Sequence, residues 1–169
     1  MPPRQKPGRS KQNYVTPQAF LEAVKRQLGI REFKWDLAAD ASNTAAGLWY
    51  EHGSLAANWT FPFQPSQPVQ GWCWLNPPFA NIEPWAKKCW EESRKGCHIA
   101  FLVPASVGSD WCRDWVDRKA TIVYFLNGRI PFIPDKPKWG YPKDCMLALY
   151  QPDRHYKTTY EVWNWRAAS

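Results

Sequence analysis

The sequence has no long run of apolar residues. A helix that crosses a membrane needs about 20 predominantly apolar residues in succession, and no segment of this chain approaches that length. The first residues also lack the short apolar stretch of a secretory signal peptide. The sequence therefore predicts neither a membrane protein nor a secreted one, and we expect a cytoplasmic location.

Cysteines are few, odd in number and never spaced as Cys-x-x-Cys. The five are Cys73, Cys89, Cys97, Cys112 and Cys145. A disulfide framework uses an even number, and a structural zinc site usually contains a Cys-x-x-Cys pair. The adjacent Cys97 and His98 have no further ligands at a suitable spacing. We therefore expect reduced thiols and no metal.

Basic residues and tryptophans are abundant. The chain has 22 Lys and Arg against 15 Asp and Glu, a formal charge of +7, and 12 Trp among 169 residues. A basic domain favours polyanions, of which nucleic acid is the commonest. Flat aromatic rings also offer surfaces on which bases can stack. These features indicate a nucleic-acid partner, and a basic protein without such a partner is the alternative.

The length fits one domain preceded by a short arm. Residues 1–13 contain four basic residues, three prolines and no acid, a composition that cannot fold alone. We expect a flexible basic arm over residues 1–13 and a single domain over residues 14–169. The arm either contacts phosphates or is a solvated tail, and the sequence does not distinguish the two.

Strands and helices alternate through the chain. Thr16 is the expected N-cap of a first helix, with Pro17 at its first position and Gly29 at its end. Asn81 and Ser109 are expected to cap two further helices, the first of them over residues 82–95. The expected strands cover residues 33–37, 72–75, 98–103, 121–126 and 145–150. This order predicts an α/β fold, a mostly parallel sheet with helices on both faces.

Two polar motifs come directly after predicted strands. Asp36 lies at the end of one strand, and Asn76 follows the strand over residues 72–75. Ligands bind at the carboxyl ends of strands in such sheets. We therefore expect Asp36 and Asn76 to face the same edge. The alternative for Asp36 is a helix cap or a solvated acid.

The tetrapeptide Asn76-Pro77-Pro78-Phe79 suits chemistry on an amine whose lone pair is delocalised. The Asn76 side-chain oxygen and the Pro77 carbonyl can accept hydrogen bonds from the amine protons, which is electrostatic preorganisation. The prolines fix φ and lack a donor, so the loop is stiff. Phe79 can stack on a base that has left the duplex. The alternative is a simple turn that ends the strand.

Six segments in order resemble the phage-type DNA N6-adenine methyltransferases, small relatives of the Dam enzymes. They are Tyr14-Val15-Thr16-Pro17, Trp35-Asp36-Leu37-Ala38-Ala39-Asp40, Trp74-Leu75-Asn76-Pro77-Pro78-Phe79, Ala80-Asn81-Ile82-Glu83-Pro84-Trp85, Phe101-Leu102-Val103-Pro104-Ala105 and Asn127-Gly128-Arg129-Ile130-Pro131-Phe132. The resemblance covers residues 14–151, most of the chain. It implies a Rossmann-like methyltransferase fold, S-adenosylmethionine as cofactor, DNA as partner and, for a phage protein, the host cytoplasm.

The resemblance also implies roles for single residues. Asn76, Pro77, Pro78 and Phe79 would form the catalytic loop. The cofactor pocket would be lined by Asp36 and Ala38, with Thr16 and Pro17 nearby. The Phe-x-Gly-x-Gly loop of many adenine methyltransferases is absent, and the small residues after Asp36 stand in its place. Asn58 is a weaker cofactor candidate, where a carboxylate would be expected.

Basic residues later in the chain are candidates for contact with DNA. Arg129 lies in the last of the six matching segments, where it either meets DNA or shapes the site. Lys136, Lys138 and Lys143 surround Trp139-Gly140-Tyr141, a mixture typical of nucleic-acid contact or of a Pro-rich surface loop. The alternative functions are methylation of RNA adenine or protein glutamine, and a non-catalytic nucleic-acid-binding module of the same fold.

Overall fold

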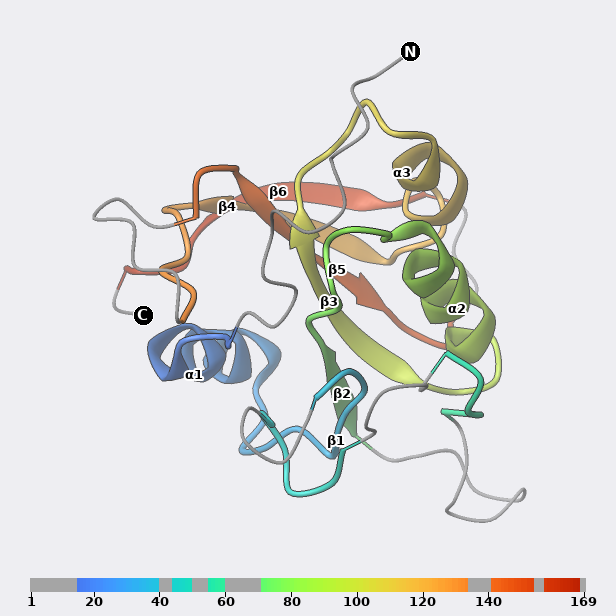
Figure 1. Ribbon diagram of the computed structural model, residues 1–169, viewed down its shortest axis with the longest axis horizontal. Helices are drawn as coiled ribbons and strands as arrows, with labels where there is room; N and C mark the ends of the chain where they lie inside the picture. Colours follow the sequence, from blue (N-terminus) through green and yellow to red (C-terminus); the bar gives the residue numbers. More distant parts are fainter. Residues whose placement is uncertain are drawn as a thin grey trace.

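A six-stranded sheet with helices on both faces organises the molecule (Figure 1). The computed structural model describes residues 15–39, 44–49, 55–59, 71–133, 141–153 and 157–167. The strands in them are β1 (Trp35–Asp36), β2 (Trp72–Leu75), β3 (His98–Pro104), β4 (Ile122–Asn127), β5 (Cys145–Tyr150) and β6 (Thr159–Asn164). The helices are α1 (Gln18–Leu28), α2 (Glu83–Ser93) and α3 (Asp110–Trp115).

The sheet is mixed, with the strand order β1-β2-β3-β5-β4-β6. Strand β5 pairs antiparallel with both β3 and β4, whereas the pairs β1–β2, β2–β3 and β4–β6 are parallel. The strand β5 therefore runs against the other five. Consecutive strands such as β4 and β5 can pair antiparallel without the crossover connection that a parallel pair needs. The sequence pattern alone did not indicate this reversal.

Side chains of the central strands alternate between two apolar cores. In β3, Ile99, Phe101 and Val103 join the core beneath α2 and α3, and Ala100 and Leu102 join the core beneath α1. Strand β5 divides its residues in the same way. Strands covered on both faces are apolar throughout, which is why residues 98–103 and 145–150 were recognisable as strands in the sequence.

The helix boundaries correct three expectations. Thr16 is not a helix cap, because Pro17 is the N-cap of α1. Asn81 is not a cap either, since Ile82 holds that position and α2 begins at Glu83. Ser109 does occupy the N-cap of α3, but its hydroxyl donates to the Ser106 carbonyl at 2.6 Å rather than capping the helix. Gly29 ends α1 in the left-handed conformation, at φ 66°, as expected.

The C-terminal segment adds a strand that the sequence did not predict. Strand β6 pairs parallel with β4 along its whole length, from Thr159 opposite Ile122 to Asn164 opposite Asn127. Most of its residues are exposed. Thr159-Tyr160-Glu161-Val162 alternates polar and apolar residues as a strand does, but this short pattern was not recognised as one.

The ends of five strands define the edge that concerns function. Strands β1, β2, β3, β4 and β6 run in one direction, so their last residues lie along one border of the sheet, here called the carboxyl edge. The predicted arm over residues 1–13 lies outside the described residues. Within the described part of the chain, no helix is long and apolar enough to cross a membrane.

Candidate active site

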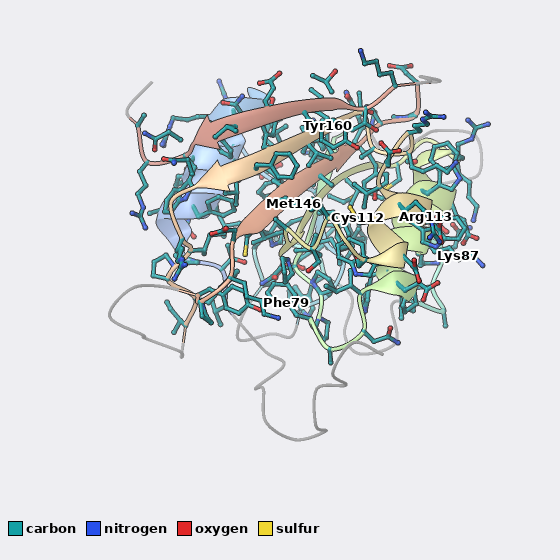
Figure 2. The ribbon with its side chains drawn as sticks, turned by 90° about the horizontal axis from the view of Figure 1, so that it is seen from above. Phe79, Lys87, Cys112, Arg113, Met146 and Tyr160 are labelled. Atoms are coloured by element: carbon teal, nitrogen blue, oxygen red, sulfur yellow. The ribbon has the colours of Figure 1, made fainter. Side chains whose placement is uncertain are left out.

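The loop Asn76–Phe79 leaves the carboxyl edge directly after β2. Strand pairing stops at Leu75, and α2 begins only at Glu83. Pro77 is buried, and the other three residues of the loop are partly buried. Figure 2 shows Phe79 on the same side of the view as Met146 at the start of β5, away from Lys87 and Arg113 on α2 and α3. The four residues predicted as a catalytic loop are thus contiguous and held at this edge.

Thr16 fixes the side chain of Asn76. The Asn76 Nδ2 atom donates to Thr16 Oγ1 at 3.1 Å, across 60 positions of sequence. Thr16 is itself buried, because it lies between the start of α1 and the sheet. In this orientation the amide nitrogen faces Thr16 and the amide oxygen points away from it. Thr16 was expected as a helix cap and near the cofactor, and the structure shows it bound to Asn76.

Asp36 is buried at the end of β1, next to the strand that leads to Asn76. Its carboxylate accepts the backbone N–H groups of Ala38 at 3.2 Å and Ala45 at 2.8 Å. The Leu37 N–H donates to the Trp74 carbonyl at 2.9 Å. This bond ties the end of β1 to β2 two residues before Asn76. The structure therefore brings the Asp36 and Asn76 motifs to neighbouring points of the carboxyl edge.

The environment of Asp36 is unusual for a carboxylate. Only 3% of the residue is exposed. Burial raises its pKa to about 6, while the two backbone N–H groups act in the opposite direction. Within the described part of the chain no cation forms an ion pair with it. A carboxylate has about four acceptor positions, so Asp36 keeps capacity for a ligand that donates hydrogen bonds.

Asn58 lies on a segment that is tied to α2. The segment 55–59 ends at Trp59, whose backbone N–H donates to Glu92 Oε2 at 3.1 Å. The Trp59 ring stacks on Trp85 with centroids 6.4 Å apart. Asn58 itself is exposed. The structure thus ties Trp59, the neighbour of Asn58, to α2. Asp36 and Asn76 instead lie at the ends of the paired strands β1 and β2. Glu92, which organises this segment, was not singled out in the sequence.

Phe79 packs with two other rings of the described residues, Phe132 and Tyr141, and the three are here called the aromatic cluster. The Phe79 centroid lies 5.9 Å from that of Phe132 and 5.6 Å from that of Tyr141. Phe132 and Tyr141 are also 5.6 Å apart, and all three pairs are edge-on. Edge-to-face pairs add about 0.5–1.5 kcal/mol beyond their burial. The Tyr141 N–H donates to the Ile130 carbonyl at 2.9 Å, which secures the cluster.

The sequence indicated the members of the aromatic cluster only separately. Phe132 appeared as the last residue of a matching segment, and the structure places it in contact with Phe79, with 1% of the residue exposed. Tyr141 was expected in a basic loop, without a stated partner. The contact spans 62 residues from Phe79 to Tyr141, and no local pattern reports such a separation.

The predicted DNA-binding residues are only partly described. Arg129 follows β4 at the carboxyl edge, and its side chain is 48% exposed, with Nε 4.0 Å from Asp144 Oδ1. Lys143 is exposed just before β5. Lys136 and Lys138 lie outside the described residues. Two residues absent from the prediction, Trp165 and Arg166, bond to the carbonyls of Gly128 and Arg129.

All five cysteines are buried thiols. Cys73 and Cys97 lie closest, with Sγ atoms 3.8 Å apart. Burial raises the pKa of Cys89 well above the ordinary thiol value, and the contact with Cys73 together with burial does the same for Cys97. Among the described residues, no group of three His, Cys, Asp or Glu side chains is arranged to hold a metal ion.

Comparison with known proteins identifies the family. The family model of Dam, DNA N-6-adenine-methyltransferase, matches residues 4–164. The DNA N-6-adenine-methyltransferase of Haemophilus phage HP1 (strain HP1c1) is 27% identical over 150 residues, which cover 85% of this chain and 80% of the phage protein. No solved structure matches this chain. The match spans the strands, the Asn76–Phe79 loop and Asp36, and the chain therefore belongs to the Dam family of DNA N6-adenine methyltransferases.

Proposed function

We propose that the chain methylates adenine with S-adenosylmethionine as donor, and that residues 76–79 form the catalytic loop at the carboxyl edge. The observation that carries the proposal is the Asn76 amide, held by Thr16 directly after β2 and beside the end of β1. Family membership supplies the reaction and its DNA substrate. The reaction takes place in the cytoplasm, that of the host cell if a phage carries the gene.

The catalytic loop acts by accepting hydrogen bonds. The N6 amine of adenine is a poor nucleophile, because its lone pair is delocalised into the ring. The Asn76 oxygen and the Pro77 carbonyl accept its two protons and favour a pyramidal nitrogen. S-adenosylmethionine would supply the methyl group when bound, and the two acceptors would hold the nitrogen lone pair toward that group while one amine proton would leave to solvent. Fixed acceptors need little reorganisation when charge develops, and the Thr16 bond provides that fixity for Asn76.

The residues at the end of β1 fit the proposed cofactor. S-adenosylmethionine supplies an electrophilic methyl group on a positively charged sulfur, and it also carries an ammonium group and two hydroxyls. The buried Asp36 carboxylate keeps acceptor positions without an ion-pair partner among the described residues. Ala38 is small enough for close approach. We assign the cofactor pocket to Asp36 and Ala38, with Thr16 and Pro17 beside it and Asn58 as a further candidate.

Phe79 is proposed to receive the flipped adenine on its ring. Stacking of this kind is worth about 1–3 kcal/mol per base. Phe79→Ala should therefore weaken capture of the base, and Phe79→Tyr should restore it, because any large ring offers a face. The measurement is the fluorescence of 2-aminopurine at the target position of a duplex, which rises when the base leaves the stack. Equal fluorescence for Phe79→Ala and the original protein would contradict this role.

Arg129 and Lys143 are proposed to contact the DNA backbone from the carboxyl edge. Both are exposed, and Arg129 lies three residues before Phe132 of the aromatic cluster. Lys136 and Lys138 are proposed for the same role from the sequence alone. Phosphate contacts fix the position of a protein on a duplex without reading its sequence.

A transfer assay with tritiated S-adenosylmethionine tests the proposal. Unmethylated DNA, RNA and protein are offered separately, and label is expected in DNA adenine only. Label in RNA or protein alone would overturn the DNA assignment, and DNA binding without transfer would indicate a non-catalytic module. Calorimetry with S-adenosylhomocysteine tests the cofactor independently, and Asp36→Ala should weaken that binding.

A further inference from the structure

The turn after β6 is bound to the loop that carries Arg129. The Trp165 Nε1 atom donates to the Gly128 carbonyl at 2.7 Å, and the Arg166 Nη2 atom donates to the Arg129 carbonyl at 2.7 Å. Two side chains in succession thus bind two carbonyls in succession. The Trp165 ring is anchored in turn against Phe20 of α1, at 5.1 Å between centroids. The turn is therefore a fixed part of the carboxyl edge.

Gly128 makes this approach possible. Its φ of 107° is in the region that favours glycine. A Cβ atom there would lie 3.1 Å from Trp165 Nε1 and 3.2 Å from Arg166 Nε. Both distances are tighter than nearly all real Cβ contacts. The backbone at Gly128 is thus suited to bring the Arg166 guanidinium against the loop.

Among the described residues, the pair of arginines has little acidic compensation. Arg166 uses one of its five N–H groups on the Arg129 carbonyl and lies over the Trp165 ring, 5.1 Å from its centroid. Arg129 has Asp144 at 4.0 Å, but that carboxylate is 81% exposed. Such surface pairs contribute about 0–1 kcal/mol, so a phosphate can replace the carboxylate. Guanidinium groups bind phosphate oxygens through paired N–H donors.

The position of the arginine pair relates it to the target base. Arg129 lies three residues before Phe132, which contacts Phe79 at 5.9 Å. When a base is flipped, the nucleotide rotates about its backbone, so its flanking phosphates stay at the rim of the pocket. We infer that Arg166 and Arg129 together bind the DNA backbone beside the flipped adenine. The inference rests on the proposed function and adds Arg166 and Trp165 to its site.

The salt dependence of DNA affinity tests the inference. Loss of one phosphate contact lowers the slope of log affinity against log salt by about 0.9. The ratio of the DNA affinity of the original protein to that of Arg166→Gln should therefore fall about 3.5-fold between 50 and 200 mM salt. Arg166→Lys keeps a charge that binds phosphate and should retain the slope. KM for DNA should rise in Arg166→Gln while turnover at saturating DNA stays, as expected when binding is lost uniformly.

A matched control removes an arginine from the other end of the same strand. Arg118 lies before β4, whereas Arg129 lies after it. The Arg118 side chain is 80% exposed. Arg118→Gln should leave the salt slope unchanged. An unchanged slope in Arg166→Gln, or an equal decrease in Arg118→Gln, would overturn the inference. If Arg166→Gln does not fold, Arg129→Gln tests the same phosphate contact. An unchanged salt slope in Arg129→Gln would then reject the inference.

The outcomes separate this inference from the proposed function. Methyl transfer to DNA by the original protein, with a normal salt slope in Arg166→Gln, rejects the arginine pair alone. A reduced slope in Arg166→Gln, with no transfer by the original protein, supports the arginine pair and rejects the proposed function.

Discussion

Two buried carboxylates, Asp36 at the end of β1 and Glu92 near the end of α2, have opposite surroundings. Asp36 is 3% exposed and Glu92 is 2% exposed. Glu92 accepts Lys95 Nζ at 2.9 Å, Lys88 Nζ at 3.3 Å and the Trp59 N–H at 3.1 Å. Asp36 accepts only backbone N–H groups among the described residues. Similar burial thus accompanies a carboxylate paired with lysines in one region and, among the described residues, a carboxylate without an ion pair in the other.

The difference separates a region that maintains structure from one that is available to a ligand. A buried charge is costly unless it is paired and hydrogen-bonded. Glu92 meets that condition within the chain and ties the segment 55–59 to α2. Asp36 meets it only in part, which is typical of groups that bind or react. The region of Asp36 and Asn76 should therefore govern activity, and the region of Glu92 should govern stability.

Asn76→Ala should give the largest effect, a loss of turnover, with a smaller loss of stability because the buried Thr16 loses its hydrogen bond to Asn76. Removal of one preorganised hydrogen-bonding group typically lowers turnover about 10²- to 10³-fold. Single-turnover methyl transfer measures the rate, and calorimetry and thermal melting measure cofactor binding and stability. Thr16→Val is the companion variant, because it removes the partner of the Asn76 amide and should lower turnover by less. A wild-type rate in Asn76→Ala would refute the proposed mechanism.

Asp36 should make stability depend on pH. Its pKa is raised from 3.8 to about 6, so the folded protein holds this proton more tightly than the unfolded chain. The stabilisation from the protonated form is complete below pH 4 and is lost as pH rises through 6, by on the order of 3 kcal/mol. Denaturant unfolding gives the free energy of unfolding of the original protein and of Asp36→Asn. The difference between the two values should change by this amount between pH 4 and 7. If this difference in unfolding free energy does not change with pH, the pKa of Asp36 is not raised in the folded protein.

Glu92→Ala should lower stability more than activity, the opposite of what we expect for Asn76→Ala. The variant leaves the Trp59 N–H without its acceptor, and an unsatisfied buried donor costs about 1–3 kcal/mol. The free energy of unfolding, measured with urea, should therefore fall by about 2 kcal/mol. Glu92→Gln keeps an acceptor and should lose less. Unchanged stability in Glu92→Ala would end the proposed contrast between the two regions.

Lys95→Ala should give the smallest effect. Its ion pair with Glu92 is 2.9 Å long, but the lysine side chain is 52% exposed. Exposed pairs contribute about 0–1 kcal/mol, and Lys88 still faces the same oxygen at 3.3 Å. Urea unfolding should detect a loss below about 1 kcal/mol. A loss as large as that of Glu92→Ala would mean that compensation of Glu92 depends on this lysine.

The sequence was most informative where burial imposed a pattern. Strands β2, β3 and β5 were predicted within a residue because their residues are almost all buried. Asp36 and Asn76 were correctly expected at the same edge, since parallel strands end at one edge, and the structure adds that their strands are neighbours. Strand β6 was missed, although Tyr160 and Val162 alternate with polar residues over its first four positions.

Contacts between distant segments were beyond the reach of local patterns. The bond between Thr16 and Asn76 spans 60 residues, that between Trp59 and Glu92 spans 33, and that between Trp165 and Gly128 spans 37. A threonine before a proline predicts a helix cap from sequence, even where the threonine hydroxyl binds another group in the folded protein. The expected cap at Thr16 was wrong for that reason, and its bond to Asn76 required the fold.

The packing of Trp165 on Phe20 has a consequence for protein synthesis. Phe20 belongs to α1, which follows Thr16, and Trp165 comes after the last strand. Translation delivers α1 before Trp165, so the ring contact that Phe20 of α1 makes with Trp165 cannot form until residue 165 has left the ribosome. A chain released before residue 165 would therefore lack this ring contact on α1, the helix that begins two residues after Thr16.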